Sequence, residues 1–209
     1  MFIENHMTLN PQTVRPNTLV AEALGSLQHG RFHHLPVVDD AGRLVGIITD
    51  RDFRSAVGYD QHVRANLRVE EIMSTDVVTV RRDAPLEEAI RLFFEHRVGA
   101  LPVVQGQQLV GIITKHDIMK AARDWLGLDR AGRRIEVAIP LGVSDIVHAL
   151  SALSDDDEIY SLVAARLRTD GREPVLYIRT ANSNAPIVER KLRQRGAILL
   201  APEKPPPAL

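Results

Sequence analysis

The sequence predicts an α/β (α+β) fold made of two copies of a small unit, followed by a third unit of different pattern. Leu35-Pro36-Val37-Val38 recurs as Leu101-Pro102-Val103-Val104, at an offset of 66 residues. Self-similarity of this kind indicates a tandem duplication. From about residue 132 the repeated motifs do not return, and another order of strands and helices begins. The expected units are 1–66, 67–127 and 132–200, with a disordered tail over 201–209.

A second motif supports the duplication. Gly46-Ile47-Ile48-Thr49 followed by Asp52 returns as Gly111-Ile112-Ile113-Thr114 followed by Asp117, now at an offset of 65 residues. The lost residue falls in the turn between the two apolar runs of each copy. A duplicated fold tolerates a change of length in such a turn, because connecting turns lie at the surface.

Each copy shows the same order of elements. A short strand, Val77–Val80 in the second copy, leads into a helix with an apolar stripe at Leu86, Ala89, Ile90, Phe93 and Phe94. In the first copy the runs 35–38 and 44–48 are predicted to form a hairpin. A second helix follows directly after Thr49 and after Thr114. Because one unit buries too little surface alone, the two units are expected to share one core.

The third unit is predicted from its own periodicity. In order, the elements are a strand at 134–139, a helix with apolar positions Ile146, Ala149, Leu150 and Leu153, strands at 159–168 and 174–180, a helix between Asn184 and Gly196, and a strand at 197–200. The acidic run Asp155–Glu158 is expected to be a solvated loop. The order βαββαβ is the ferredoxin-like arrangement.

Composition excludes several classes of protein. Hydrophobic residues make up 44% and charged residues 25% of 209 residues, as in an ordinary globular chain. The formal charge of -1 does not favour nucleic acid or an anionic membrane as a partner. Cysteine is absent, which excludes disulfides, thiol nucleophiles and thiolate metal sites. The first residues resemble no signal peptide and no apolar run is long enough to span a membrane, so we expect a cytoplasmic protein.

The Thr-x-x-Asp ends of the repeated motif have two interpretations. Thr49 with Asp52, and Thr114 with Asp117, have the spacing of a capping box, in which each side chain satisfies a backbone N–H at the helix start. The same geometry suits a nucleotide, because a helix N-terminus attracts phosphate and an acidic residue there can bind a ribose diol. Arg51 lies between the two residues of the first pair, and Lys115 and His116 lie between those of the second; each is a candidate anion contact or a solvated surface residue. Spacing alone leaves both interpretations open.

The repeated motifs resemble tandem CBS domains, the Bateman module, over roughly residues 1–125. The resemblance implies that adenine binds between the two units and that the Thr and Asp positions hold phosphate and ribose. By position, one site would use Thr13, His34, Pro36, Thr49 and Asp52, and the other Thr79, Ala100, Pro102, Thr114 and Asp117. His33, Arg51 and His116 are added as candidate phosphate contacts. Because histidines precede Leu35 while smaller residues precede Leu101, we expect the two clefts to be unequally occupied.

The third unit resembles an ACT domain, mainly in the order of its elements. Amino acids bind some relatives of that family at a turn after the first strand, which corresponds here to Leu141 and Gly142. Ile139 stands where the family often has Asp, which favours a dimerisation role. Two CBS units followed by an ACT-like domain resemble proteins of acetoin utilisation. That resemblance implies a regulatory role in acetoin or acetyl-CoA metabolism.

The functional hypothesis is a non-enzymatic sensor that binds AMP, ADP, ATP or S-adenosylmethionine and requires no cofactor. It is expected to form a homodimer, to act on a regulated protein and to bind no membrane. The alternatives are an assembly protein with vestigial clefts and an amino-acid sensor acting through the ACT-like domain. No catalytic residues are assigned, since nothing couples a nucleophile to an oriented base. No metal site is assigned either, since His33 and His34 are adjacent on a strand and point apart.

Overall fold

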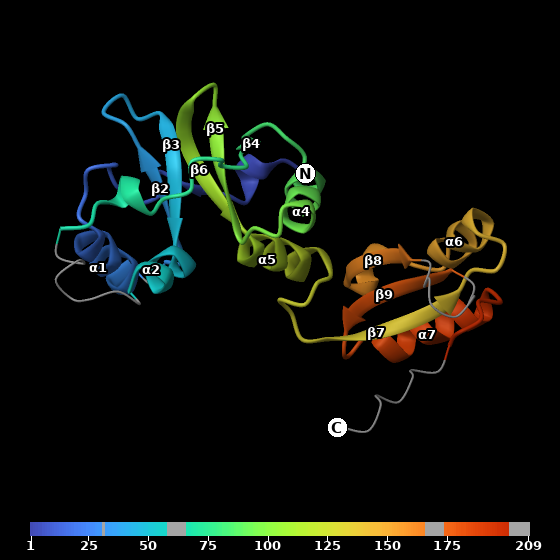
Figure 1. The fold of residues 1–209 in the computed structure, drawn as a ribbon. Coiled ribbons are helices and arrows are strands. Elements are labelled where there is room, and N and C mark those ends of the chain that lie inside the picture. The colour runs from blue at the N-terminus through green and yellow to red at the C-terminus, as the bar shows by residue number, and fades with distance from the viewer. Residues whose placement is uncertain (31, 58–65, 166–173, 201–209) are drawn as a thin grey trace. The chain divides into compact units, whose positions relative to one another are not determined.

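The computed structural model describes residues 1–30, 32–57, 66–165 and 174–200. The chain divides into two compact units, an N-terminal unit of residues 1–119 and a C-terminal unit of residues 120–209 (Figure 1). None of the helices in the described ranges combines the length and the apolar character that crossing a bilayer requires.

Each repeat of the N-terminal unit forms a helix, a two-stranded hairpin and a second helix, as predicted (Figure 1). The first repeat consists of α1 (Val20–Gly30), β2 (His34–Val38), β3 (Leu44–Thr49) and α2 (Asp50–Val57), preceded by η1 (Ile3–Asn5) and β1 (Thr8–Leu9). The second consists of α4 (Leu86–Glu95), β5 (Ala100–Gln105), β6 (Gln108–Thr114) and α5 (Lys115–Trp125), preceded by η2 (Val69–Glu71) and β4 (Val80–Arg81). Gly42 and Gly106 take positive φ in the two hairpin turns, where the chain must reverse tightly.

Two details of the predicted second repeat are wrong. The strand expected at Val77–Val80 is only Val80–Arg81, which pairs in parallel with Val103 and Val104. The predicted stripe of α4 also included Phe94, whose side chain is 79% exposed, while Leu92 is buried in its place. Leu92 and Phe94 both lie at the edge of the apolar stripe of α4, where helical periodicity alone does not determine which of them faces the core.

The repeats complete each other's sheets. β1, which begins the first repeat, pairs with β6 of the second, and Ser74, which precedes β4, bridges to Ile47 of β3. Glycine makes this possible, because a Cβ on Gly111 would lie 2.7 Å from Met7 Sδ, and one on Gly46 would lie 2.5 Å from Met73 Sδ. The repeated Met and Gly positions are therefore contacts between repeats.

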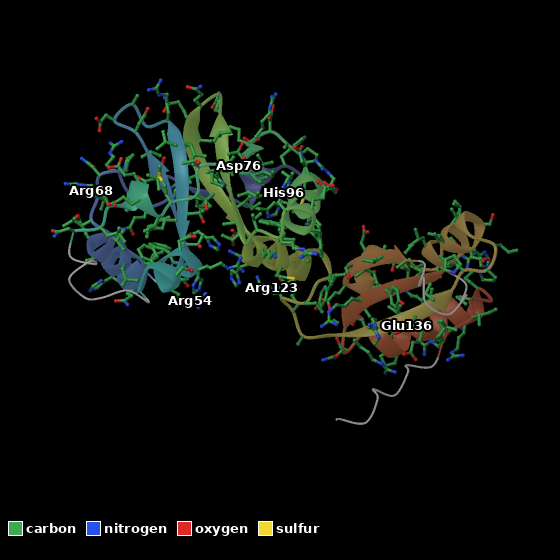
Figure 2. The ribbon with its side chains drawn as sticks, viewed as in Figure 1. Arg54, Arg68, Asp76, His96, Arg123 and Glu136 are labelled. Carbon is green, nitrogen blue, oxygen red and sulfur yellow. The ribbon has the colours of Figure 1, made fainter. Side chains whose placement is uncertain are left out.

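The segment that enters the second repeat is fixed to the start of α1. The backbone N–H of Val69 donates to the carbonyl of Thr18 at 2.9 Å, and Val20 donates to Leu67 at 2.8 Å. Arg68, labelled in Figure 2, donates a guanidinium N–H to the carbonyl of Asn17 at 2.6 Å. Through Val69, this segment also joins the buried core of the first repeat.

The C-terminal unit has the predicted order of elements up to its last helix. It consists of β7 (Gly132–Ala138), α6 (Val143–Leu150), η3 (Asp155–Asp157), β8 (Ile159–Ala165), β9 (Val175–Ala181) and α7 (Ala185–Gln194). The strands form an antiparallel sheet in the order β7-β9-β8. Alternate residues of β7 and β9, among them Val137 and Ile178, pack with Ala149 of α6 and Val188 of α7 in one core. Both helices therefore cover the same face of the sheet.

The ends of the C-terminal prediction need correction. The strand predicted at 197–200 is reduced to an isolated antiparallel bridge between Leu199 and Val137 of β7. Residues 166–168 of the predicted strand 159–168, and the tail predicted at 201–209, lie outside the described residues.

The acidic run at Asp155–Glu158 is not simply a solvated loop. Its first three residues form η3, and Asp157 is only 2% exposed. Lys191 Nζ of α7 lies 2.7 Å and 2.8 Å from the two carboxylate oxygens of Asp157. Ser154 adds its backbone N–H and its hydroxyl. The run thus contains a buried ion pair that joins η3 to α7, because a buried carboxylate needs such partners.

Candidate functional site

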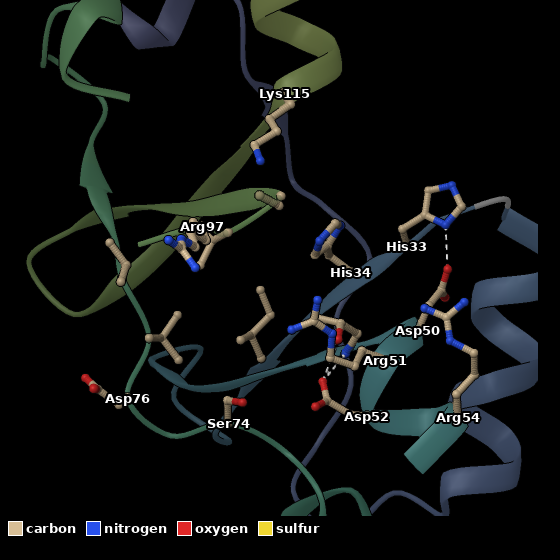
Figure 3. A pocket seen from close by; sticks show the side chains of 17 residues that line it. His33, His34, Asp50, Arg51, Asp52, Arg54, Ser74, Asp76, Arg97 and Lys115 are labelled. Atoms are coloured by element: carbon tan, nitrogen blue, oxygen red, sulfur yellow. Dashed lines mark hydrogen bonds and ion pairs between the residues drawn. The ribbon is translucent and has the colours of Figure 1, made fainter. Parts of the chain in front are cut away.

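A cleft of about 510 Å³ lies between the two repeats of the N-terminal unit (Figure 3). One side is the junction of β3 and α2, together with the start of β2. The other side is the segment before β4, the turn between α4 and β5, and the start of α5. The lining residues are His33, His34, Ile47, Thr49, Asp50, Arg51, Asp52, Arg54, Ser74, Asp76, Val77, Val78, Arg97, Val98, Gly99, Ala100 and Lys115.

Thr49 and Asp52 form the N-terminal cap of α2 at the wall of the cleft. Thr49 donates its backbone N–H at 2.8 Å and its hydroxyl at 2.7 Å to Asp52 Oδ2. Thr114 and Asp117 repeat these contacts at α5, where the backbone N–H of Asp117 also donates to Thr114 Oγ1 at 3.3 Å. The capping-box interpretation thus describes both motifs, and it is complete in the second. Only the first motif lines the cleft.

Two histidines enter the cleft from the start of β2. His33 Nδ1 lies 2.6 Å from Asp50 Oδ2, within hydrogen-bond distance, and both side chains are exposed. The ring of His34 packs against the second repeat, since a Cβ on Gly99 would lie 2.9 Å from His34 Nε2. Burial and then the neighbouring His33 lower the pKa of His34, while Asp50 and Asp52 oppose this shift. The His34 ring is therefore neutral at pH 7.

The structure brings together six of the thirteen predicted nucleotide-binding residues. His33, His34, Thr49, Arg51, Asp52 and Ala100 line the cleft. The remaining predicted residues do not line it; they are Thr13, Pro36, Thr79, Pro102, Thr114, His116 and Asp117. Pro36 and Pro102 are buried in their strands. The cleft thus combines one residue assigned to the second site, Ala100, with three assigned to the first and with the candidate phosphate contacts His33 and Arg51.

Sequence reasoning missed several lining residues of the second repeat. Val77 and Val78 line the cleft because the chain leaves the sheet before β4. Arg97, in the turn after α4, also lines the cleft. One signal was available for Arg97, because the equivalent position of the first repeat, Arg31, is also arginine.

The turn predicted as a weak ligand site lies in the C-terminal unit. Gly142 has φ 73° and precedes α6, so the turn requires glycine geometry. The backbone N–H of Leu141 donates to Asp145 Oδ2 at 2.6 Å. The backbone N–H of Leu141 is therefore already hydrogen-bonded to a carboxylate of the chain itself.

Metal-binding side chains do not converge in the described part of the chain. No group of three or more histidine, aspartate or glutamate residues has the arrangement needed to hold a metal ion there.

A profile of the CBS domain matches residues 3–59 and 69–124, which together are more than half of the chain. The chain belongs to the CBS-domain family. The two matched ranges correspond to the two repeats, so the N-terminal unit is a CBS pair, or Bateman module.

Solved structures of CBS pairs resemble this unit. A protein named as an acetoin utilization protein, AcuB, from Vibrio cholerae is 32% identical, with a TM-score of 0.57 over 62% of this chain and 95% of that chain. The CBS pair of protein MJ0100, in complex with 5′-methylthioadenosine and S-adenosyl-L-methionine, is 30% identical, with a TM-score of 0.53 over 58% and 95%. CBSX2 in complex with AMP is 31% identical, with a TM-score of 0.54 over 62% and 98%. Two of these three structures therefore contain an adenosyl ligand.

Curated relatives include larger enzymes. Inosine-5′-monophosphate dehydrogenase of Methanocaldococcus jannaschii is 34% identical over 160 residues, which are 73% of this chain and 30% of the enzyme. The enzyme of Aquifex aeolicus is 31% identical over 170 residues, 71% of this chain and 34% of the enzyme. The chain thus spans about a third of the length of these relatives.

Proposed function

We propose that the chain is a non-enzymatic regulatory sensor that binds an adenine nucleotide or an adenosyl ligand in the cleft between its CBS repeats. The cleft itself carries the proposal. Its volume of about 510 Å³ is in the range of small-molecule sites. The AMP and adenosyl ligands of the similar CBS pairs support the same class of ligand.

The lining residues suit the parts of such a ligand. Asp52 Oδ1 makes no hydrogen bond within the described part of the chain, so it remains free to accept from a ribose diol. Val77, Val78 and Ile47 provide an apolar wall for the adenine ring. The cap at the start of α2 and the basic side chains around the cleft favour phosphate.

The described residues of the cleft suit binding better than catalysis. The hydroxyl of Thr49 donates to Asp52, and among the described residues no hydroxyl of the cleft donates to His33 or His34. A nucleophile without a base to accept its proton reacts slowly at neutral pH. A regulatory role needs only a ligand that prefers one arrangement of the repeats. A preference of about 100-fold supplies roughly 2.7 kcal/mol, which is sufficient for a switch.

The proposed context is acetoin or acetyl-CoA metabolism, with a regulated protein as partner. The similarity to AcuB of Vibrio cholerae, which extends over 95% of that chain, supports this assignment. The C-terminal unit would then transmit the signal to the partner or to a second subunit.

The C-terminal unit is proposed to be ACT-like and to form a homodimer. Its βαββα order, the sheet order β7-β9-β8 and the bridge at Leu199 support the ACT-like fold. An apolar stripe on α6 supports dimerisation, because Val143 and Val147 are 74% and 61% exposed. Asp145 already occupies the N–H of Leu141, which favours this role over amino-acid sensing.

Thermal unfolding of the full chain with a panel of ligands tests the sensor. The panel contains AMP, ADP, ATP, S-adenosylmethionine, cyclic di-adenylate, NAD and branched-chain amino acids. A ligand at about 100 times its Kd stabilises by about 2.7 kcal/mol, which raises Tm by about 5–10 °C. We expect a shift with adenosyl compounds alone. A shift with amino acids alone would place sensing in the C-terminal unit, and no shift with any ligand would leave assembly as the function.

A further inference from the structure

Unpaired positive charge surrounds the cleft, although the whole chain carries a formal charge of only -1. Four cations line it: Arg51, Arg54, Arg97 and Lys115. None of their side chains makes an ion pair or a hydrogen bond within the described part of the chain. In Figure 3 they come from α2, from the turn after α4 and from the first residue of α5. The cations therefore converge from both repeats.

Three carboxylates, Asp50, Asp52 and Asp76, also line the cleft, so its four cations leave a net formal charge of +1 with neutral histidines. Asp50 is paired with His33, and Asp52 is held by the backbone and hydroxyl of Thr49. Among the described lining residues, Asp76 is then the only carboxylate without a partner. The two carboxylates nearest the start of α2 thus have partners of their own, while the four cations have none among the described residues, and an excess of positive charge in a cleft attracts an anionic ligand.

Arg97 has a backbone conformation that favours another residue type. It follows the C-cap His96 of α4 and has φ 55°, in the left-handed region. Glycine is the usual residue at this position of a helix end, because it adopts that conformation without a steric penalty. Arginine costs backbone energy there and places a cation at the cleft. Strained backbone of this kind collects at ligand-binding positions.

We propose that the cleft selects its adenosyl ligand by charge, taking adenosine di- or triphosphate in preference to S-adenosylmethionine, with Arg97 as a specificity-determining residue. This inference rests on the proposed function, since it concerns the same cleft. A polyphosphate carries several negative charges that Arg51, Arg97 and Lys115 can contact together. S-adenosylmethionine instead has a sulfonium, an ammonium and a single carboxylate, so it brings a net positive charge among these cations. Like charges close together lower affinity.

Calorimetric titration of the full chain with ATP, S-adenosylmethionine and 5′-methylthioadenosine tests the inference. We expect the wild-type protein to bind ATP at least about tenfold more tightly than S-adenosylmethionine, with a ratio that falls between about 0.1 M and 0.5 M salt. Arg97→Gly should weaken ATP binding by about tenfold and leave binding of uncharged 5′-methylthioadenosine unchanged. Its Tm should be equal or higher, since glycine relieves the backbone. Arg97→Lys should keep most of the preference for ATP.

Arg91→Ala is the matched control. Arg91 is an exposed arginine of α4 that pairs with Glu95 and does not line the cleft, so its loss should leave ATP affinity unchanged. Equal affinity of the wild-type protein for ATP and S-adenosylmethionine would overturn the inference while leaving the sensor intact. An equal loss of ATP and 5′-methylthioadenosine binding in Arg97→Gly would overturn the role of charge. Failure of all three compounds to bind would overturn the proposed function itself.

Discussion

Asp52 and Asp117 make the same contacts but have different surroundings. Each carboxylate accepts the backbone N–H and the hydroxyl of the threonine three residues before it. Asp52 lines the cleft, whereas Asp117 does not. The duplication therefore provides an internal control that separates a helix cap from a ligand contact.

Replacing either aspartate by alanine is expected to lower the free energy of unfolding by about 1 kcal/mol, as loss of a cap does. Asp52→Ala should also weaken ATP binding by about tenfold, because the ribose loses a charged acceptor. Asp117→Ala should leave ATP affinity unchanged. Urea unfolding and calorimetric titration measure the two effects. Equal losses of affinity in both variants would contradict a role of Asp52 in binding.

His34 should make nucleotide binding depend on pH. In the free protein, burial and then His33 lower the pKa of His34, while Asp50 and Asp52 raise it by less. A bound phosphate would raise that pKa, so the complex would take up a proton and affinity would increase as pH falls from about 7 toward 5. ATP titrations across this range test the sign. His34→Asn should remove the increase, and a pH-independent affinity in the wild-type protein would exclude His34 from the phosphate contact.

The spacing of one short motif predicted the contact between Thr49 and Asp52, whereas His34 and Ala100 were predicted by the resemblance to CBS domains. Thr49 and Asp52 share a helix start, so their contact follows from spacing. Gly99 lies against His34, and Arg97 lines the same cleft, only because the repeats pack against each other, which no local pattern specifies. The direction of Val77 and Val78 depends on where β4 begins, and the ends of strands are poorly determined by propensity.

Elements of the C-terminal unit were predicted in the right order because their apolar periods differ clearly. The burial of Asp157 was not predicted, since an acidic run between a helix and a strand normally indicates solvent exposure. Its burial depends on Lys191 of α7, which is distant in sequence and adjacent in space. The exposure of the acidic run therefore depends on a contact between elements and cannot be predicted from its composition.

Asp157→Ala is expected to lower the free energy of unfolding by about 1–2 kcal/mol, because the hydrogen bonds from Lys191 and Ser154 to the carboxylate are lost while the partly exposed Lys191 remains solvated. Burial raises the pKa of Asp157, but hydrogen bonds from Lys191 and Ser154 outweigh it and hold that pKa below its usual value. The contribution is therefore present above about pH 4 and is lost as pH falls through the lowered pKa. Urea unfolding at pH 7 and pH 3 measures both effects. Asp155→Ala, an exposed change in η3, should alter stability by less than about 0.5 kcal/mol.

The exposed stripe of α6 predicts where two copies meet. Val147→Asp places a charge in the stripe and is expected to shift the protein from dimer to monomer, because a buried unpaired charge opposes association. Ser144→Asp adds the same charge to the exposed surface of the same helix, outside the stripe, and should leave the dimer intact. Light scattering at several protein concentrations measures whether each variant is a dimer or a monomer. A dimer that survives Val147→Asp would place the interface elsewhere.

The whole molecule consists of two units with separate cores. We expect calorimetric unfolding to show two transitions, because each unit has its own buried cluster. ATP should raise only the transition of the N-terminal unit, since the cleft lies within residues 33–115. Asp157→Ala should lower only the other transition. If a single transition is seen, and both ATP and the Asp157→Ala substitution change its Tm, the two units unfold together.

The exchange of strands between the repeats limits how such a protein can arise and be divided. β1 closes the sheet of the second repeat, and Ser74 extends the sheet of the first. A chain cut between residues 66 and 67 would give two fragments, each lacking the segment that completes it. A single-unit ancestor would have completed its sheet in the same way, by exchanging its N-terminal segment with that of a second copy. Covalent linkage of two such copies by gene duplication would then have kept the exchanged segments in place while allowing the two copies to differ in sequence.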